Sequence, residues 1–288
     1  MTFNQILVPV NGSERDEIAL GSALSIAKYS NAHVMAQFVR PDVRYVTPVV
    51  SFSLLPDLMA DISRSAKQIA DETSRTARRH FTMAAIEAKA SIADRTKDRR
   101  EVTASFHEAD GFVFECVAQA AKFADLLVYG PLGEPEDFQT SAGFAEALMN
   151  ARRPVLITPK KVTGPFRKAV IGWDGGHATA RAVCAALPLL TAADSVEIVA
   201  VRRPSFSQME EFRDLRDYLA LSGIHATKRI IEKTSRSIGE ELIDAATGSG
   251  ADLLVMGGYG HSPLRESLFG GTTAYAIDEP LLPIFLAH

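Results

Sequence analysis

The residues best suited to chemistry in this chain are glycines and hydroxyl side chains in its last quarter. They are Gly257, Gly260, Gly270, Gly271, Thr272 and Thr273. They follow the apolar run Ala251–Val255, which is short enough to be one buried strand. Glycine lets the backbone turn tightly and present its N–H groups to an anion, and hydroxyl groups bind phosphate oxygens. The spacing G-x2-G-x9-G therefore predicts a phosphate-binding loop.

The same pattern occurs a second time, nearer the N-terminus. The heptapeptide 124–130 closely repeats 251–257, at an offset of 127 residues. This offset also aligns the later glycines of the motif, Gly133 with Gly260 and Gly143 with Gly270. The apolar runs at 6–10 and 169–173 open the two halves, and those at 154–157 and 283–286 close them. These agreements indicate a duplicated domain, with copies at 1–159 and 166–288 joined by the linker Pro159–Phe166.

Apolar runs alternate with helical patterns in both halves. The expected strands are Gln5–Val10, His33–Val39, Glu101–Phe106, Asp125–Tyr129, Val155–Thr158, Lys168–Trp173, Ser195–Val201, Ala226–Ile231, Asp252–Met256 and Leu281–Leu286. Helices are expected from Ser13 and over Leu58–Lys89, Gly111–Phe123, Phe138–Ala151, Ala178–Leu190, Gln208–Ser222 and Ser237–Ala246. The alternation predicts an α/β fold of two tandem, five-stranded, mainly parallel sheets with helices on both faces. The N-terminal half also carries a helical insertion at about 41–89.

Composition limits the class of protein. The chain has 288 residues, 47% of them hydrophobic and 23% charged, as in globular proteins of two domains. Its net charge of −4 argues against a nucleic-acid partner. We find no signal peptide and no apolar run long enough for a membrane span. Cys116 and Cys184 are interpreted as reduced core residues, so we expect a cytoplasmic protein without a membrane partner.

On these residues the chain resembles a tandem universal stress protein. Members of that family that bind nucleotides carry an Asp after the first strand, matched by Asp174, and the glycine motif after the fourth, matched by Gly257, Gly260 and Gly270. The resemblance implies a Rossmann-like fold and an adenine nucleotide, ATP with Mg²⁺, whose adenine meets the backbone near Val201. The sequence departs from the family at Gly271, where Ser or Thr is usual; Thr272 and Thr273 follow and could supply the hydroxyl.

The N-terminal copy of the motif is eroded. Asn11 replaces the carboxylate of Asp174, and Phe144 and Ala145 replace the residues that should offer hydroxyl groups. Three carboxylates also fall between its glycines, where they would repel phosphate: Glu134, Glu136 and Asp137. We therefore expect nucleotide in the C-terminal half alone, with the N-terminal copy kept for packing or for another ligand.

Several readings stay open at single residues. Asp174 fits either a ligand to nucleotide or metal, or a helix-capping residue. His261 could donate to a phosphate or be a surface histidine, and Arg265 could face phosphate or solvent. The helical insertion could cover its own domain or form a partner or dimer surface. The last strand of each half, Val155–Thr158 and Leu281–Leu286, is expected to meet its counterpart across a pseudo-two-fold axis, as in an intramolecular pseudo-dimer.

No residue pattern predicts a strong catalyst. We find no Ser-His-Asp spacing, no zinc pattern and no phosphate-loop lysine, so slow ATP hydrolysis is the most we expect. Three classes of function remain. The leading one is a nucleotide-binding regulatory protein of the stress response, with an unknown protein partner; the others are an adenine-nucleotide enzyme and a ligand-free interaction module.

Overall fold

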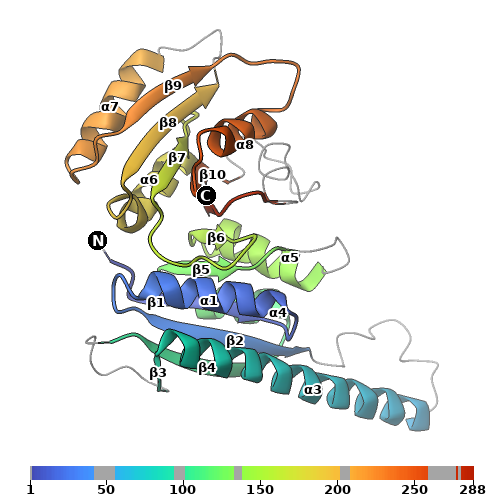
Figure 1. Ribbon diagram of the computed structural model, residues 1–288. Helices are drawn as coiled ribbons and strands as arrows, with labels where there is room; N and C mark the ends of the chain where they lie inside the picture. Colours follow the sequence, from blue (N-terminus) through green and yellow to red (C-terminus); the bar gives the residue numbers. More distant parts are fainter. Residues whose placement is uncertain are drawn as a thin grey trace.

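The computed structural model describes residues 2–41, 56–93, 101–132, 138–201, 208–258, 277 and 280–288 (Figure 1). Its strands are β1 (Gln5–Val10), β2 (His33–Pro41), β3 (Ser91–Ile92), β4 (Thr103–Gly111), β5 (Leu126–Tyr129), β6 (Val155–Ile157), β7 (Lys168–Gly172), β8 (Ser195–Val201), β9 (Thr227–Ile231), β10 (Leu253–Gly257) and β11 (Ile284–Ala287). Its helices are α1 (Arg15–Ala27), α3 (Pro56–Ala88), α4 (Val113–Ala121), α5 (Phe138–Ala145), the π-helical turn η1 (Glu146–Asn150), α6 (His177–Leu190), α7 (Gln208–Ala220) and α8 (Ile238–Gly248). Strands and helices thus alternate as the sequence predicts.

The strands form one sheet in the order β3-β4-β2-β1-β5-β6-β11-β10-β7-β8-β9. Every neighbouring pair is parallel except β6 and β11. Apart from the short β3, the two halves have the same strand order when each is read outward from that antiparallel pair. In both halves the order reverses beside the first strand, between β1 and β5 and between β7 and β10, and ligands of open parallel sheets bind at such a switch point.

The junction between the halves corrects one prediction. The expected contact between the last strands is confirmed, because β6 pairs with β11 and Leu156 lies opposite Phe285. The α/β class with a mainly parallel sheet and helices on both faces is confirmed, but the expected separation into two five-stranded sheets is wrong, because this pairing joins them into one sheet of eleven described strands. An edge strand exposes unpaired N–H and C=O groups. Here the backbone groups of β6 and β11 form hydrogen bonds with each other, so neither strand is left as an exposed edge.

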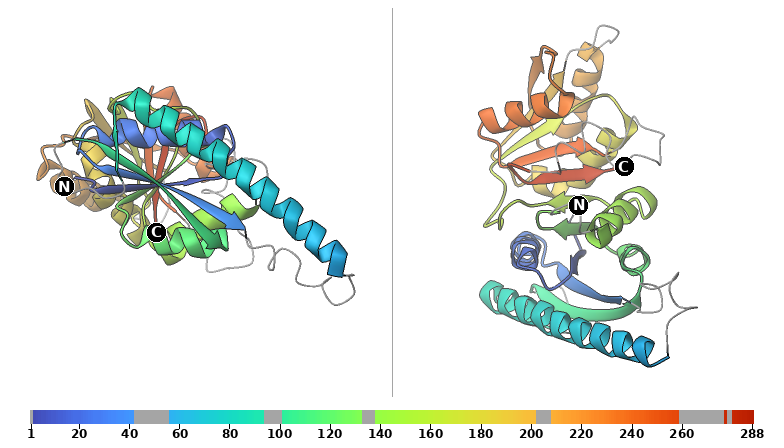
Figure 2. Two further views of the ribbon diagram at one scale, coloured as in Figure 1. Left: turned by 90° about the horizontal axis from the view of Figure 1, so that it is seen from below. Right: turned by 90° about the vertical axis from the view of Figure 1, so that its right-hand side faces the viewer.

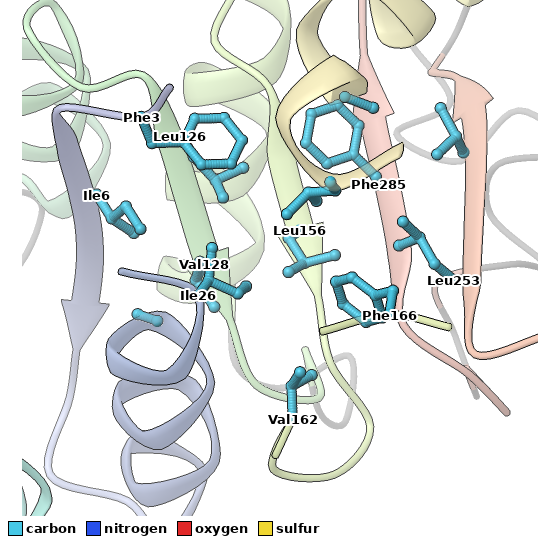
Figure 3. Packing of buried hydrophobic residues seen from close by; sticks show 14 of the residues in the cluster. Phe3, Ile6, Ile26, Leu126, Val128, Leu156, Val162, Phe166, Leu253 and Phe285 are labelled. Carbon is cyan, nitrogen blue, oxygen red and sulfur yellow. The ribbon is translucent and has the colours of Figure 1, made fainter. Parts of the chain in front are cut away.

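The hydrophobic core is continuous across the junction on both faces of the sheet. On one face α1, α3, α6 and α7 pack against the strands, and on the other α4, α5 and α8 do so (Figure 2). Figure 3 shows buried side chains running from β1 through β5 and β6 to β11 and β10, with Leu156 beside Phe285. The two halves therefore share their core as well as their backbone hydrogen bonds.

The linker is packed against the body of the protein. Val162 and Phe166 are buried in the shared core (Figure 3). The backbone N–H of Val162 donates to Ser22 Oγ at 2.9 Å, and that of Gly164 donates to Ser25 Oγ at 3.0 Å. Both serines lie on α1, so the segment between the halves is fixed to the N-terminal half. The division into domains at 1–159 and 166–288 stays a prediction.

The repeated Ala-Asp-Leu-Leu-Val segment has the same structural role in both halves. Asp125 accepts hydrogen bonds from the backbone N–H groups of Asn4 and Gln5, at 2.6 and 3.1 Å. Asp252 accepts them from Arg167 and Lys168 at 2.8 and 2.9 Å. The carboxylates thus tie the start of β5 to the start of β1 and the start of β10 to the start of β7.

The helical insertion is a single long helix over its described part. Ala77, Phe81 and Ala85 of α3 are buried against the sheet and α1. The N-terminal end of α3 projects beyond the strands in Figures 1 and 2. Residues 42–55 lie outside the described part of the chain.

Two remaining expectations concern cysteines and membranes. Both thiols are free, but Cys184 is exposed and Cys116 is only partly buried, so the prediction that they are core residues is wrong. Among the described residues, no helix combines the length and the apolar character that a bilayer span requires.

The junction predicts a large effect of shortening Phe285, which is fully buried. Phe285→Ala should lower the free energy of unfolding by about 3–5 kcal/mol, because it leaves a cavity between the halves. Phe123→Ala, at a side chain that is 82% exposed, should change it by about 0.5 kcal/mol or less. Denaturant unfolding measures both. A loss of similar size in the two variants would contradict the described packing.

Candidate functional site

Three predicted site residues lie at the carboxyl ends of neighbouring strands. Asp174 follows β7, Val201 ends β8 and Gly257 ends β10, and β7 is hydrogen-bonded between the other two strands. These positions adjoin the switch point between β7 and β10. The other predicted residues lie outside the described part of the chain: Gly260, His261, Gly270, Gly271, Thr272 and Thr273.

Thr179, on the first turn of α6, brings Asp174 and Gly257 together. Its hydroxyl donates to Asp174 Oδ1 at 2.6 Å, and the same oxygen accepts the backbone N–H of Gly176 at 2.8 Å. A Cβ atom placed on Gly257 would lie 2.7 Å from both the backbone nitrogen and the hydroxyl of Thr179. Only glycine allows this approach without displacement of the helix. The site is thus a close contact between the end of β10, the β7–α6 loop and the start of α6.

Asp174 does not cap α6 in the usual way. The N-cap residue of α6 is Gly176, which has no side-chain capping hydrogen bond. Asp174 instead organises the loop before the helix through Gly176 and Thr179. Its second possible role, as a ligand to nucleotide or metal, stays a prediction.

The start of the glycine loop also contacts distant parts of the chain. The backbone N–H of Gly258 donates to the carbonyl of Ala287 at 2.8 Å, and the Gly258 carbonyl lies 2.9 Å from His288 Nδ1. Arg181 of α6 donates to the His288 carbonyl at 2.8 Å. A Cβ on Gly258 would lie 3.0 Å from Leu148 of the N-terminal half. The loop therefore begins where both halves meet, with an arginine at the same edge.

The corresponding place in the N-terminal half keeps the packing but has different polar groups. A Cβ on Gly130, at the end of β5, would lie 2.7 Å from the carbonyl oxygen of Arg15 at the start of α1. Asn11, the counterpart of Asp174, contacts Thr140 Oγ1 on α5 through its side-chain nitrogen at 3.3 Å. Its Oδ1 accepts the N–H of Ser13 at 3.0 Å. These contacts join the loop after β1 to α5.

Phe144 occupies the position that follows the third glycine of the N-terminal motif. It is a core residue, 2% exposed, whose ring meets that of Tyr129 edge-on with centroids 5.9 Å apart. Gly143 lies within α5, next to Val113 and Val117 of α4. This segment therefore serves helix packing. Gly133, Glu134, Glu136 and Asp137 lie outside the described residues.

A buried acid links α3 to the loop after β1. The two carboxylate oxygens of Asp16 accept the backbone N–H groups of Asn11 and Gly12, at 3.1 and 2.8 Å. His80 Nδ1, on α3, lies 3.8 Å from Asp16 Oδ2, and His80 Nε2 lies 3.5 Å from Glu17 Oε1. Burial raises the pKa of Asp16 to about 6, against the opposing effects of these hydrogen bonds and of His80. The charged form of Asp16 is thus disfavoured in the folded protein.

Comparison with known proteins classifies the C-terminal half. The model of the universal stress protein family matches residues 165–283. This segment is a universal stress protein domain. It contains the Asp174–Thr179–Gly257 contact and the whole glycine motif, so the resemblance proposed from those residues is confirmed for this half. The match does not extend to the N-terminal half.

Similar proteins extend over more of the chain. A universal stress protein of Synechocystis is 23% identical over 194 residues, which are 60% of this chain and 61% of that protein. The match thus spans less than two thirds of that relative. The crystal structure of a universal stress protein from Archaeoglobus fulgidus has a TM-score of 0.65 at 15% identity, and covers 99% of this chain and 96% of that one. A functionally unknown protein of Pseudomonas aeruginosa has a TM-score of 0.55 at 16% identity, with coverage of 99% and 92%. These structures share the fold of the whole chain.

Sequence reasoning missed several residues at this edge. Thr179 could have been found, because it lies in the first turn of a predicted helix and five residues after Asp174. Leu148, Arg181 and His288 gave no such signal, because their places depend on the pairing of β6 with β11 and of β10 with β11.

The tight contact at Gly257 predicts a sensitive position. Gly257→Ala should lower the free energy of unfolding by about 1–3 kcal/mol, because its Cβ would press on the backbone of α6. Gly248→Ala is the matched control, because a Cβ at this helix position meets nothing within 4 Å; it should be neutral or stabilise by up to about 1 kcal/mol. Equal effects of the two variants in thermal unfolding would refute the contact.

The raised pKa of Asp16 predicts a pH dependence of stability. The folded state holds this proton up to about pH 6, whereas the unfolded state loses it near the ordinary pKa of 3.8, so the free energy of unfolding falls as pH rises between the two. Relative to Asp16→Asn, wild type should gain on the order of 2–3 kcal/mol on going from pH 7 to pH 4. Denaturant unfolding at several pH values measures this gain.

Asp61→Asn, at an exposed carboxylate, serves as the control. A difference between wild type and Asp16→Asn that does not vary with pH would contradict the raised pKa of Asp16 in the folded protein.

Proposed function

We propose that this chain is a nucleotide-binding regulatory protein of the stress response that binds one adenine nucleotide, ATP with Mg²⁺, in its C-terminal half. The observation that carries the proposal is the convergence of Asp174 and Gly257 on Thr179, at the switch point of the sheet. It lies within the segment that matches the universal stress protein family. A carboxylate beside a glycine turn at a helix start suits a ligand with both polar and phosphate groups.

Different residues of the C-terminal half bind different parts of the nucleotide. The backbone at Val201 meets the adenine, and Asp174 accepts from the sugar side or contributes to Mg²⁺. The N–H groups around Gly257, Gly260, Gly270 and Gly271 bind the phosphates, with the hydroxyls of Thr272 and Thr273 and the ring of His261 as further donors. Between Gly257 and Gly270 the sequence has one positively and one negatively charged side chain, Arg265 and Glu266. The hydrogen-bond donors of this segment are otherwise backbone N–H groups and uncharged side chains.

The N-terminal half acts as a second, non-binding domain of the same type. It supports the C-terminal half through β6, and Leu148 packs beside the start of the glycine loop. Phe144 is a buried core residue, and it lacks the hydroxyl group that would bind a phosphate at this position of the motif. Proposed boundaries are those of the sequence repeat, 1–159 and 166–288. A protein partner would then respond to nucleotide bound in one half of a rigidly joined pair.

The role is binding, not turnover. The sequence offers no Ser-His-Asp spacing, no zinc pattern and no phosphate-loop lysine. Strong hydrolysis would require a positioned base. We therefore expect nucleotide occupancy to act as the signal, with ATP hydrolysis slow or absent.

The proposal predicts a thermal shift that one glycine controls. ATP with Mg²⁺ at about 100 times its Kd should stabilise the folded chain by roughly 2.7 kcal/mol, since it binds the folded state alone. This corresponds to a rise of roughly 5–10 °C in Tm for domains of this size. Gly260→Val should abolish the rise, because a branched side chain would stand where phosphate approaches. Calorimetric titration should give one site per chain.

Gly133→Val is the matched control, as it alters the corresponding glycine of the N-terminal motif. It should leave the shift and the stoichiometry unchanged. Two sites per chain, or loss of binding in Gly133→Val alone, would contradict the assignment of the halves. A wild-type protein with no shift and no bound nucleotide would favour a ligand-free interaction module, and release of pyrophosphate during turnover would favour an enzyme.

A further inference from the structure

An apolar stripe runs along the outer side of α3. Ile62, Ile69, Thr76 and Met83 recur at intervals of seven residues, and Ile86 lies one turn beyond the last. Ile69, Met83 and Ile86 are 64–65% exposed. Such spacing keeps side chains on nearly the same side of a helix. Isolated exposed apolar residues are common, but a regular stripe on one helix marks a contact surface.

This stripe is separate from the face with which α3 packs on its own domain. The packing face includes Ala77, Phe81 and Ala85, together with Ser74 and His80, all buried. It already covers the N-terminal half, so the covering role does not account for the stripe. In Figures 1 and 2, α3 lies at the outer edge of the molecule, at the end of the sheet farthest from α7 and β9. A partner could therefore approach the stripe from solvent.

The charges beside the stripe indicate what that partner is. Glu72 and Arg79 are exposed and lie four residues before and three residues after Thr76, on the same side of the helix. In a parallel pair of two α3 helices, Glu72 and Arg79 would lie opposite Ala77 and Ala84 of the other copy, so neither would meet an opposite charge. In an antiparallel pair centred on Thr76, Glu72 of each copy lies near Arg79 of the other. Ile69 then faces Met83, and the two Thr76 residues meet on the axis.

We propose that two copies of this chain associate through antiparallel pairing of their α3 helices, about a two-fold axis at Thr76. The contact is isologous: each residue pair occurs twice, so one Glu72–Arg79 ion pair and one Ile69–Met83 contact lie on each side of the two Thr76 residues. From residue 64 to residue 88, where α3 ends, the paired part of the helix extends about 36 Å. The dimer forms through the N-terminal halves and leaves the C-terminal halves at its two ends. This inference is independent of nucleotide binding.

Charge reversal tests the pairing directly. Glu72→Arg and Arg79→Glu should each raise the dimer dissociation constant by about tenfold or more, because each variant places two like-charge pairs across the axis. The double variant Glu72→Arg/Arg79→Glu restores both pairs in reverse and should return the constant to within about threefold of wild type. Sedimentation velocity over a concentration series measures these constants, and circular dichroism verifies that each variant is folded.

An apolar variant supplies a second measurement. Ile69→Glu should make the protein monomeric, because it puts a charge opposite Met83 of the other copy. Leu221→Glu, at a side chain 86% exposed and outside α3, should not change the dissociation constant. Wild type that stays monomeric at all concentrations would overturn the proposal. So would a dimer that persists in Ile69→Glu, or a double charge variant no better than the single ones.

Discussion

The antiparallel pairing of β6 with β11 is the contact on which the rest of the molecule depends. Without it each half would end in an unpaired strand edge, with Leu156 and Phe285 exposed. With it, the helices on each face cover one continuous core. Because β11 lies between β6 and β10, Leu148 of the N-terminal half and His288 after β11 both come close to Gly258. The candidate site is thus built at the end of one half, on a surface completed by the other.

The two halves keep the same structural devices and differ in the groups that could bind a ligand. Asp125 and Asp252 tie their strands in the same way, and Gly130 and Gly257 both lie against the start of the first helix. The differences begin in the loop after the first strand. There the C-terminal half has a half-buried carboxylate held by Thr179, whereas the N-terminal half has an amide whose loop is bound by the buried Asp16. Residues that the fold requires are kept in both halves, whereas groups that only a ligand requires can be lost from one half.

Much of the fold is readable from local sequence patterns. Runs such as Leu126–Tyr129 and Leu253–Met256 are apolar at every position, as strands covered on both faces must be. The Ala-rich, charged composition of 58–89 predicts the long helix α3, and the helix expected from Ser237 is present, with Ser237 as its cap. The missed elements lack a local signal. The strand Ser91–Ile92 has two residues, and the last helix of the N-terminal half changes to a π-helical turn at Glu146.

Non-local contacts account for the other differences. The order of strands within each half follows from the repeat, but nothing in Val155–Ile157 alone states that its free edge pairs with Ile284–Ala287. The glycine motif of the candidate site was visible because its spacing is repeated. Thr179 and His288 became evident only when the strands that carry their neighbours were placed. Local patterns thus predict elements, and pairing between distant strands assembles the site.

Hydrogen exchange with and without ATP and Mg²⁺ tests the central claim most directly. If the C-terminal half alone binds nucleotide, amides of 174–179 and 257–273 should exchange more slowly when it is present. Those of the corresponding segments, 11–16 and 130–145, should be unchanged. Equal protection of both sets, or protection of the N-terminal set alone, would contradict the account.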